Sequence, residues 1–267
     1  MKSAIFLLLA IILVAPASFS HEEDESNFAR FDFVVAGGAG VAALLLLTAV
    51  SMIYGKKAKK GTKKIMMGLF IAISVSVTLY LAAGTVYTNM ISETGGPVHW
   101  HADFEIWDCG TKLDMIDPSG LSNRVGSPEI HEHGDDRIHV EGVLIRKDEA
   151  SLHHFLELTG SELANGHLML RTNGGYVEMS NGQACNGKEG KLQAFLYRIT
   201  NPSTVTKTGF IYEQVKLDNP EDYVLSPHIN VPPGDCIIIE LDEEKNSTDK
   251  ICETYRIAIE RGDVSGG

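Results

Sequence analysis

Two long apolar segments constrain the fold of this chain more than any other feature of its sequence. Residues 33–54 and 65–91 contain no charged side chain. Each is at least as long as the roughly 20 residues that a helix needs to cross the hydrocarbon core of a bilayer. Between them, six lysines lie in the nine residues from Lys56 to Lys64. The pattern predicts two transmembrane helices, 33–54 and 65–91, joined as an antiparallel hairpin by a basic loop at residues 55–64.

The lysine loop and the start of the chain predict the same orientation in the membrane. Short lysine-rich loops stay in the cytoplasm. Residues 1–20 carry Lys2, an apolar run and then small residues, which is the layout of a secretory signal peptide. An acidic segment, residues 21–32, follows it. We therefore expect a cell-membrane protein with its N-terminus and its large C-terminal domain outside the cytoplasm.

The C-terminal part of the chain is strongly acidic. Residues 95–267 hold 15 lysines and arginines against 29 aspartates and glutamates. Such a surface repels nucleic acid and attracts cations. The sequence therefore excludes nucleic acid as a partner and leaves the membrane, other membrane-protein subunits and cations.

All four cysteines lie in this acidic part, and an even number outside the cytoplasm predicts two disulfides. Cys236 begins an apolar run and Cys252 follows the next polar turn, which favours the pairs Cys236–Cys252 and Cys109–Cys185. Thiolate metal ligands in Cys-x-x-Cys spacing are absent from the sequence. The triplet that starts at Asn246 is an N-glycosylation acceptor in a predicted turn.

After a linker at residues 92–97, the pattern predicts a mostly β domain at 98–262 and a short tail at 263–267. Apolar and polar residues alternate from Val98, as in a strand with one buried face. A helix is expected at 147–159, where the apolar spacing changes. Further strands are expected at 137–146, 167–171, 192–200, 223–231, 236–241 and 254–260. The fold class is α+β, a β-grasp-like roll behind the helical hairpin, with a β-sandwich or a small barrel as alternatives.

Half of the ten histidines lie between residues 99 and 139. Residues two apart on a strand share a face, so His99 can act with His101, and His139 with Glu141. Neutral imidazoles are good ligands for Zn²⁺ and Cu²⁺. The sequence therefore predicts a copper or zinc site with the ligands His99, His101, His131, His133, His139 and Glu141. Four carboxylates are expected to orient the imidazoles: Asp103, Glu105, Asp135 and Asp136.

Several functions are compatible with this pattern. The first is a binding protein that holds or delivers the ion, and the second is an accessory subunit of a larger envelope complex. A third is a cupin-like metalloenzyme, since His99, His101 and Glu105 are spaced as in the first half of the cupin motif. The rest of that motif is missing, which favours a binding protein over an enzyme. A hydrated polar loop or a protonation switch would also account for clustered histidines beside carboxylates.

Three segments, VHWHADFEIWDCG, HEHGDDRIHVEGV and VPPGDCIIIE, carry a family resemblance. Over about residues 96 to 260 the chain resembles an uncharacterised family of membrane-anchored, histidine-rich extracytoplasmic proteins of archaea, in particular ammonia oxidisers. The resemblance implies an archaeal envelope protein, and it favours copper because such organisms use that metal heavily. It implies no catalytic residues.

Overall fold

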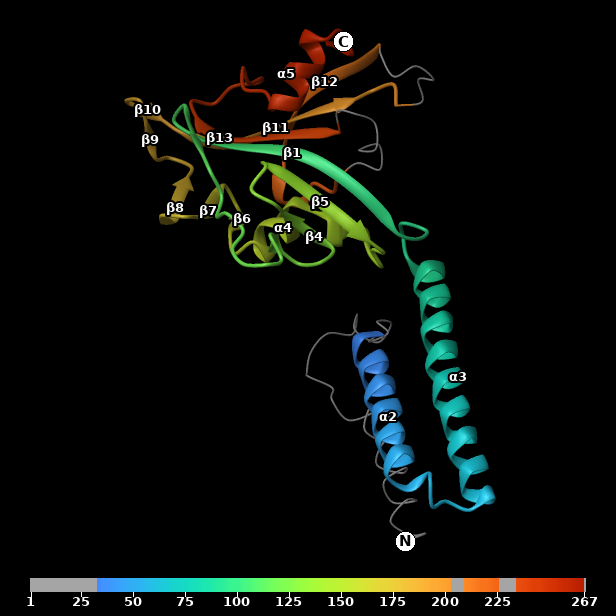
Figure 1. Ribbon diagram of the computed structural model, residues 1–267. Helices are drawn as coiled ribbons and strands as arrows, with labels where there is room; N and C mark the ends of the chain where they lie inside the picture. The colour runs from blue at the N-terminus through green and yellow to red at the C-terminus, as the bar shows by residue number, and fades with distance from the viewer. Residues whose placement is uncertain (1–32, 203–208, 226–233, 267) are drawn as a thin grey trace. The chain divides into compact units, whose positions relative to one another are not determined.

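The computed structural model describes residues 33–202, 209–225 and 234–266 (Figure 1). The expected signal peptide and acidic segment, residues 1–32, lie outside the described residues. The chain divides into two compact units, Met1–Ile91 and Ser92–Gly267.

The first unit is a pair of apolar helices. α2 runs from Phe33 to Tyr54 and α3 from Lys60 to Ile91. At 1.5 Å per residue, α2 is about 33 Å long, which matches the roughly 30 Å of a hydrocarbon core. Both helices are long and apolar enough to cross a membrane, and most of their side chains are exposed in the unit. These properties suggest membrane association.

The two helices approach each other closely at a glycine. A Cβ atom built on Gly40 would lie 2.6 Å from Cγ2 of Val77. Only a residue without a side chain fits there, so Gly40 permits the contact between α2 and α3. Gly40 therefore serves the packing of the hairpin itself.

The second unit is built on a nine-stranded mixed sheet. Eight of the strands follow the order β14-β12-β11-β13-β1-β5-β4-β3, and the ninth, β2, pairs with β1. Its centre is the parallel pair of β1 and β13, while β5 and β11 flank that pair in antiparallel fashion. The strands are β1 Val98–Asp108, β2 Thr111–Leu113, β3 Val125–Gly126, β4 Ile130–Glu132, β5 Arg137–Gly142, β11 Lys191–Ile199, β12 Phe210–Leu217, β13 Asp235–Asp242 and β14 Val264–Gly266.

Two different layers cover the two faces of this sheet (Figure 1). On one face lie helix α4, Leu152–Leu158, and a small sheet of β6 Glu162–Ala164, β7 His167–Thr172 and β8 Gly175–Ser180. The other face carries helix α5, Glu253–Glu260. In β1 the residues Ala102, Phe104 and Ile106 are buried under the first layer. The alternate residues of β1, which include His99 and His101, therefore lie on the face of α5.

The α+β class and the mostly β second unit are confirmed. In the described residues the sheet is open, with β14 and β3 at its ends, and no closed barrel forms. Parallel pairing of the first and last long strands at its centre is consistent with the expected β-grasp-like roll. The expected tail contributes a strand, since β14 pairs with β12.

Residues 254–260 were predicted to be a strand, and this prediction is wrong because they belong to α5. The alternation of Tyr255, Ile257 and Ile259 imitates a strand pattern. In the structure Tyr255 and Ala258 are buried, three residues apart, and Ile259 is exposed. Arg256 forms ion pairs at helical spacing on the outer surface.

Other predicted elements also differ from the structure: α3 begins at Lys60 and not at residue 65, and the strand predicted at 137–146 ends at Gly142. The predicted helix 147–159 is a 3₁₀ turn, η3 Lys147–Ala150, followed by α4, which begins after its N-cap Ser151. β12 was missed. In the predicted strand 223–231, Val224 forms an isolated bridge with Ser151, and residues 226–233 lie outside the described residues.

Candidate metal centre

Three neighbouring strands place a row of histidines on the face of the sheet that carries α5. In the antiparallel pair of β1 and β5, His101 lies opposite His139 and His99 lies opposite Glu141. In the pair of β4 and β5, His131 lies opposite His139. Residues directly opposite each other in an antiparallel pair share a face and touch. The register of the sheet therefore brings residues up to 42 positions apart, His99 and Glu141, into one cluster.

The imidazole rings of this row contact one another. The Nε2 atoms of His99 and His101 are 2.8 Å apart. The ring centroids of His101 and His139 are 4.7 Å apart, and those of His139 and His131 are 5.6 Å apart in a stacked pair. His133 lies against both His131 and His139, with 4.7 Å between the centroids in each case. All five histidines of the predicted site are thus brought together.

Three of them could hold a metal ion. One ligand nitrogen from each of His99, His101 and His139 lies within 4.8 Å of the other two. Imidazole nitrogens bind Zn²⁺ at about 2.0 to 2.1 Å, so two nitrogens on one ion are at most about 4.2 Å apart. The three rings are therefore close to the spacing that one ion requires. Two of the ligands come from a single strand, which limits the ordering entropy of binding.

Two carboxylates hold the rings of this group. Glu141 Oε1 lies 3.3 Å from Nδ1 of His99, and Asp135 Oδ2 lies 3.4 Å from Nε2 of His139. When an imidazole N–H donates to a carboxylate, the other ring nitrogen carries the lone pair that binds a metal. His99 would then offer Nε2 and His139 would offer Nδ1. Glu141, predicted to be a ligand, lies where it can also orient His99.

The remaining two histidines differ in environment. His131 is only 2% exposed, and its Nδ1 atom has no hydrogen-bond partner among the described residues. Nδ1 of His133 donates to the carbonyl oxygen of Asn123, which leaves Nε2 of His133 with a lone pair. His131 and His133 therefore extend the cluster from the exposed edge at His99 toward the protein interior.

The other carboxylates expected around the site have cationic partners. Asp103 accepts a hydrogen bond from Nε of Arg137 at 2.7 Å and another from the hydroxyl of Thr254 in α5. Lys112 donates to Glu105 at 3.2 Å and to Asp136 at 2.7 Å. Of the four predicted orienting carboxylates, only Asp135 has a direct contact with a histidine ring among the described contacts.

Sequence reasoning missed Arg137 and Lys112, which balance these carboxylates. Arg137 lies two residues before His139, and the period of a strand places both on one face. That signal was present in the sequence. Lys112 reaches the site because β2 folds back on β1.

Burial favours the neutral, metal-binding form of the central rings. Desolvation lowers the pKa of His101, and the neighbouring His139 and His99 lower it further. The pKa of His131 and that of His139 are also lowered, in each case mainly by burial. Asp135 opposes the shift at His139. These three imidazoles are therefore uncharged at neutral pH and available to an ion.

Two disulfides brace the unit. Cys109, just after β1, is joined to Cys185 in β9 (Ala184–Cys185), the partner of β10 (Lys188–Glu189). Cys236 in β13 is joined to Cys252, the residue before α5. These are the pairs that the sequence favoured. The predicted glycosylation acceptor Asn246 is exposed.

No protein-family model, no curated protein and no solved structure matches this chain. Its function therefore has to follow from its own residues. The fold and the cluster define a disulfide-braced β-rich unit, linked to two apolar helices, that could hold a metal ion on three histidines.

Proposed function

We propose that this protein is a membrane-anchored, extracytoplasmic metal-binding protein that holds or delivers a copper or zinc ion. The observation that carries the proposal is the group of His99, His101 and His139, whose ligand nitrogens already lie within 4.8 Å of one another. An all-nitrogen set of this kind suits copper and zinc, while iron–sulfur clusters require thiolates.

The charge and the exposure of the surroundings support uptake from solution. His99 is an exposed side chain at the edge of the cluster, while His131 is buried. The acidic surface of the unit attracts cations toward this edge. An ion from solution would therefore meet His99 first.

The helices and the cysteines support the proposed anchor and compartment. Two disulfides are stable in an oxidising compartment. The lysine loop between α2 and α3 favours a cytoplasmic position for that loop, which leaves the β-rich unit outside. The resemblance to archaeal envelope proteins agrees with this placement and favours copper.

The test is metal binding by the full chain purified in a neutral detergent. We expect about one Cu²⁺ or Zn²⁺ per chain by elemental analysis after dialysis at pH 7.5. The double variant His99→Ala/His101→Ala should lower the affinity at least about a hundredfold, since loss of an orienting group alone costs roughly 10- to 100-fold.

A matched control removes two other histidines. His153→Ala/His154→Ala deletes the same number of imidazoles from α4, on the far side of the sheet. This variant should bind the ion as the unmodified chain does. Equal loss in both double variants, or unchanged binding in His99→Ala/His101→Ala, would reject the proposed site.

A further inference from the structure

The loop end of the helical hairpin carries charge that the hairpin does not neutralise. Between residues 33 and 91 there are six lysines, all from Lys56 to Lys64, and no aspartate or glutamate. Lysine side chains without a carboxylate nearby attract anions. An anionic partner from outside the hairpin would be complementary to this end.

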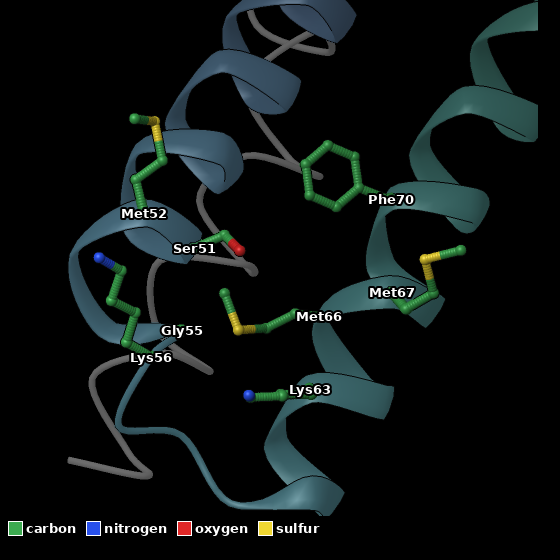
Figure 2. Close-up of a pocket in the computed structure, with 8 residues that line it drawn as sticks. All are labelled: Ser51, Met52, Gly55, Lys56, Lys63, Met66, Met67 and Phe70. Carbon is green, nitrogen blue, oxygen red and sulfur yellow. The ribbon is translucent and has the colours of Figure 1, made fainter.

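A cleft of about 650 Å³ opens at the same end, between the last turn of α2 and the first turns of α3. Figure 2 shows the side chains of Lys63, Met66 and Phe70 extending from α3 toward α2. The lining residues are Ser51, Met52, Gly55, Lys56, Lys63, Met66, Met67 and Phe70.

The cleft changes from cationic to apolar along the axis of α3. Lys63, Met66 and Phe70 are spaced three and four residues apart, so they lie on one face of the helix. Phe70 lies about 10 Å from Lys63 along the helix axis, at 1.5 Å per residue. If Lys63 is at the depth of the headgroups, Phe70 is at the depth of the acyl chains.

We propose that this cleft binds an anionic phospholipid. The phosphate group lies at the ammonium group of Lys63, the hydroxyl of Ser51 is a further donor, and Lys56 at the end of α2 adds positive charge at the rim of the cleft. The first part of an acyl chain lies along Met66 and Phe70. Both ends of such a lipid have a complementary surface here, whereas a free phosphate would use only the cationic end.

The experiment is native mass spectrometry of the full chain in a neutral detergent. Phosphatidylglycerol and phosphatidylcholine are added separately, and the fraction of protein that retains one lipid is measured. We expect phosphatidylglycerol to be retained and phosphatidylcholine to be lost at the same collision energy. Lys56→Gln/Lys63→Gln should lower the retained phosphatidylglycerol at least about fivefold.

The matched control is Lys57→Gln/Lys60→Gln, which removes the same charge from residues that do not line the cleft. Its retention of phosphatidylglycerol should equal that of the unmodified chain. Equal losses in the two variants would mean diffuse attraction to the loop, and equal retention of the two lipids would mean that the headgroup charge is not recognised. Either result overturns the proposal.

Further measurements test whether the whole lipid or only its headgroup is bound, and whether a variant loses the lipid because it is misfolded. Glycerol 3-phosphate alone should fail to bind at the concentrations at which the lipid binds, and Phe70→Ala should weaken lipid retention. Binding of glycerol 3-phosphate that Phe70→Ala leaves unchanged would identify a phosphate site and reject the lipid. Helical circular dichroism of each variant should match that of the unmodified chain.

Discussion

His99 and His101 present their Nε2 atoms to each other at 2.8 Å from successive positions on one face of β1. With Nδ1–H of His99 donating to Glu141, Nε2 of His99 carries the lone pair and accepts the proton of Nε2 of His101. His99 would then be in the tautomer that binds an ion through Nε2, while His101 would have to change its tautomer to bind through Nε2.

The first prediction separates the two roles open to Glu141. If this carboxylate orients His99, Glu141→Gln should lower the affinity for the ion by roughly 10- to 100-fold and leave the number of ions bound per chain unchanged. Competition against a coloured chelator measures the affinity. Glu162→Gln, on the exposed side of β6, is the control and should have no effect. A complete loss of the ion would instead mean that Glu141 is itself a ligand.

The second prediction concerns pH. Burial lowers the pKa of His101, His131 and His139 in the folded protein, so between the unfolded value of about 6.5 and the lower folded values the unfolded chain binds more protons. The free energy of unfolding of the metal-free protein should therefore be highest above pH 6.5 and decrease as the pH falls below it.

Thermal unfolding of the metal-free chain at pH 7.5, 6.5 and 5.5 measures this effect. His131→Phe keeps a buried ring but removes the group that titrates, so its unfolding temperature should decrease less over the same range. A melting temperature that stays constant from pH 7.5 to 5.5 would contradict the predicted burial of these imidazoles.

The pattern of β1 and β5 predicted the histidine pairs, because strand alternation alone places His99 with His101 and His139 with Glu141. The register between the strands could not be predicted, since no local signal says that His101 lies opposite His139. The contact of Asp103 with Thr254 joins residues 151 positions apart. This contact could not be predicted while residues 254–260 were interpreted as a strand.

The third prediction uses this contact. Asp103 is bound by Arg137 and Thr254, so it links β1, β5 and α5. Asp103→Ala should lower the free energy of unfolding by about 1 to 3 kcal/mol, because it leaves the half-buried guanidinium of Arg137 without its partner. The affinity for the ion should change by less than about threefold, since Asp103 orients no histidine by a direct contact. Chemical denaturation measures the stability of this variant, and metal titration of the same sample measures its affinity for the ion. A large loss of affinity with unchanged stability would contradict the prediction.

The fourth prediction concerns the disulfide beside α5. Cys236 and Cys252 are 16 residues apart, and closing a loop of that size stabilises a fold by about 3 kcal/mol in the chain-entropy model. The double variant Cys236→Ser/Cys252→Ser should therefore unfold at a lower denaturant concentration. Removing the longer loop between Cys109 and Cys185, 76 residues apart, should cost about 4 to 5 kcal/mol. The opposite order of the two losses would show that strain or residual structure outweighs loop length.

The fifth prediction tests the orientation of the chain in the membrane. The two disulfides together use all four cysteines, so a cysteine introduced at Thr62 is the only free thiol. Because it lies among the lysines of the loop, a membrane-impermeant maleimide should label it only after the cells are permeabilised. A cysteine at Asp218, on the exposed turn after β12, should be labelled in intact cells. Labelling of Thr62→Cys in intact cells would place the loop outside, and the histidine cluster would then face the cytoplasm, where disulfides rarely persist.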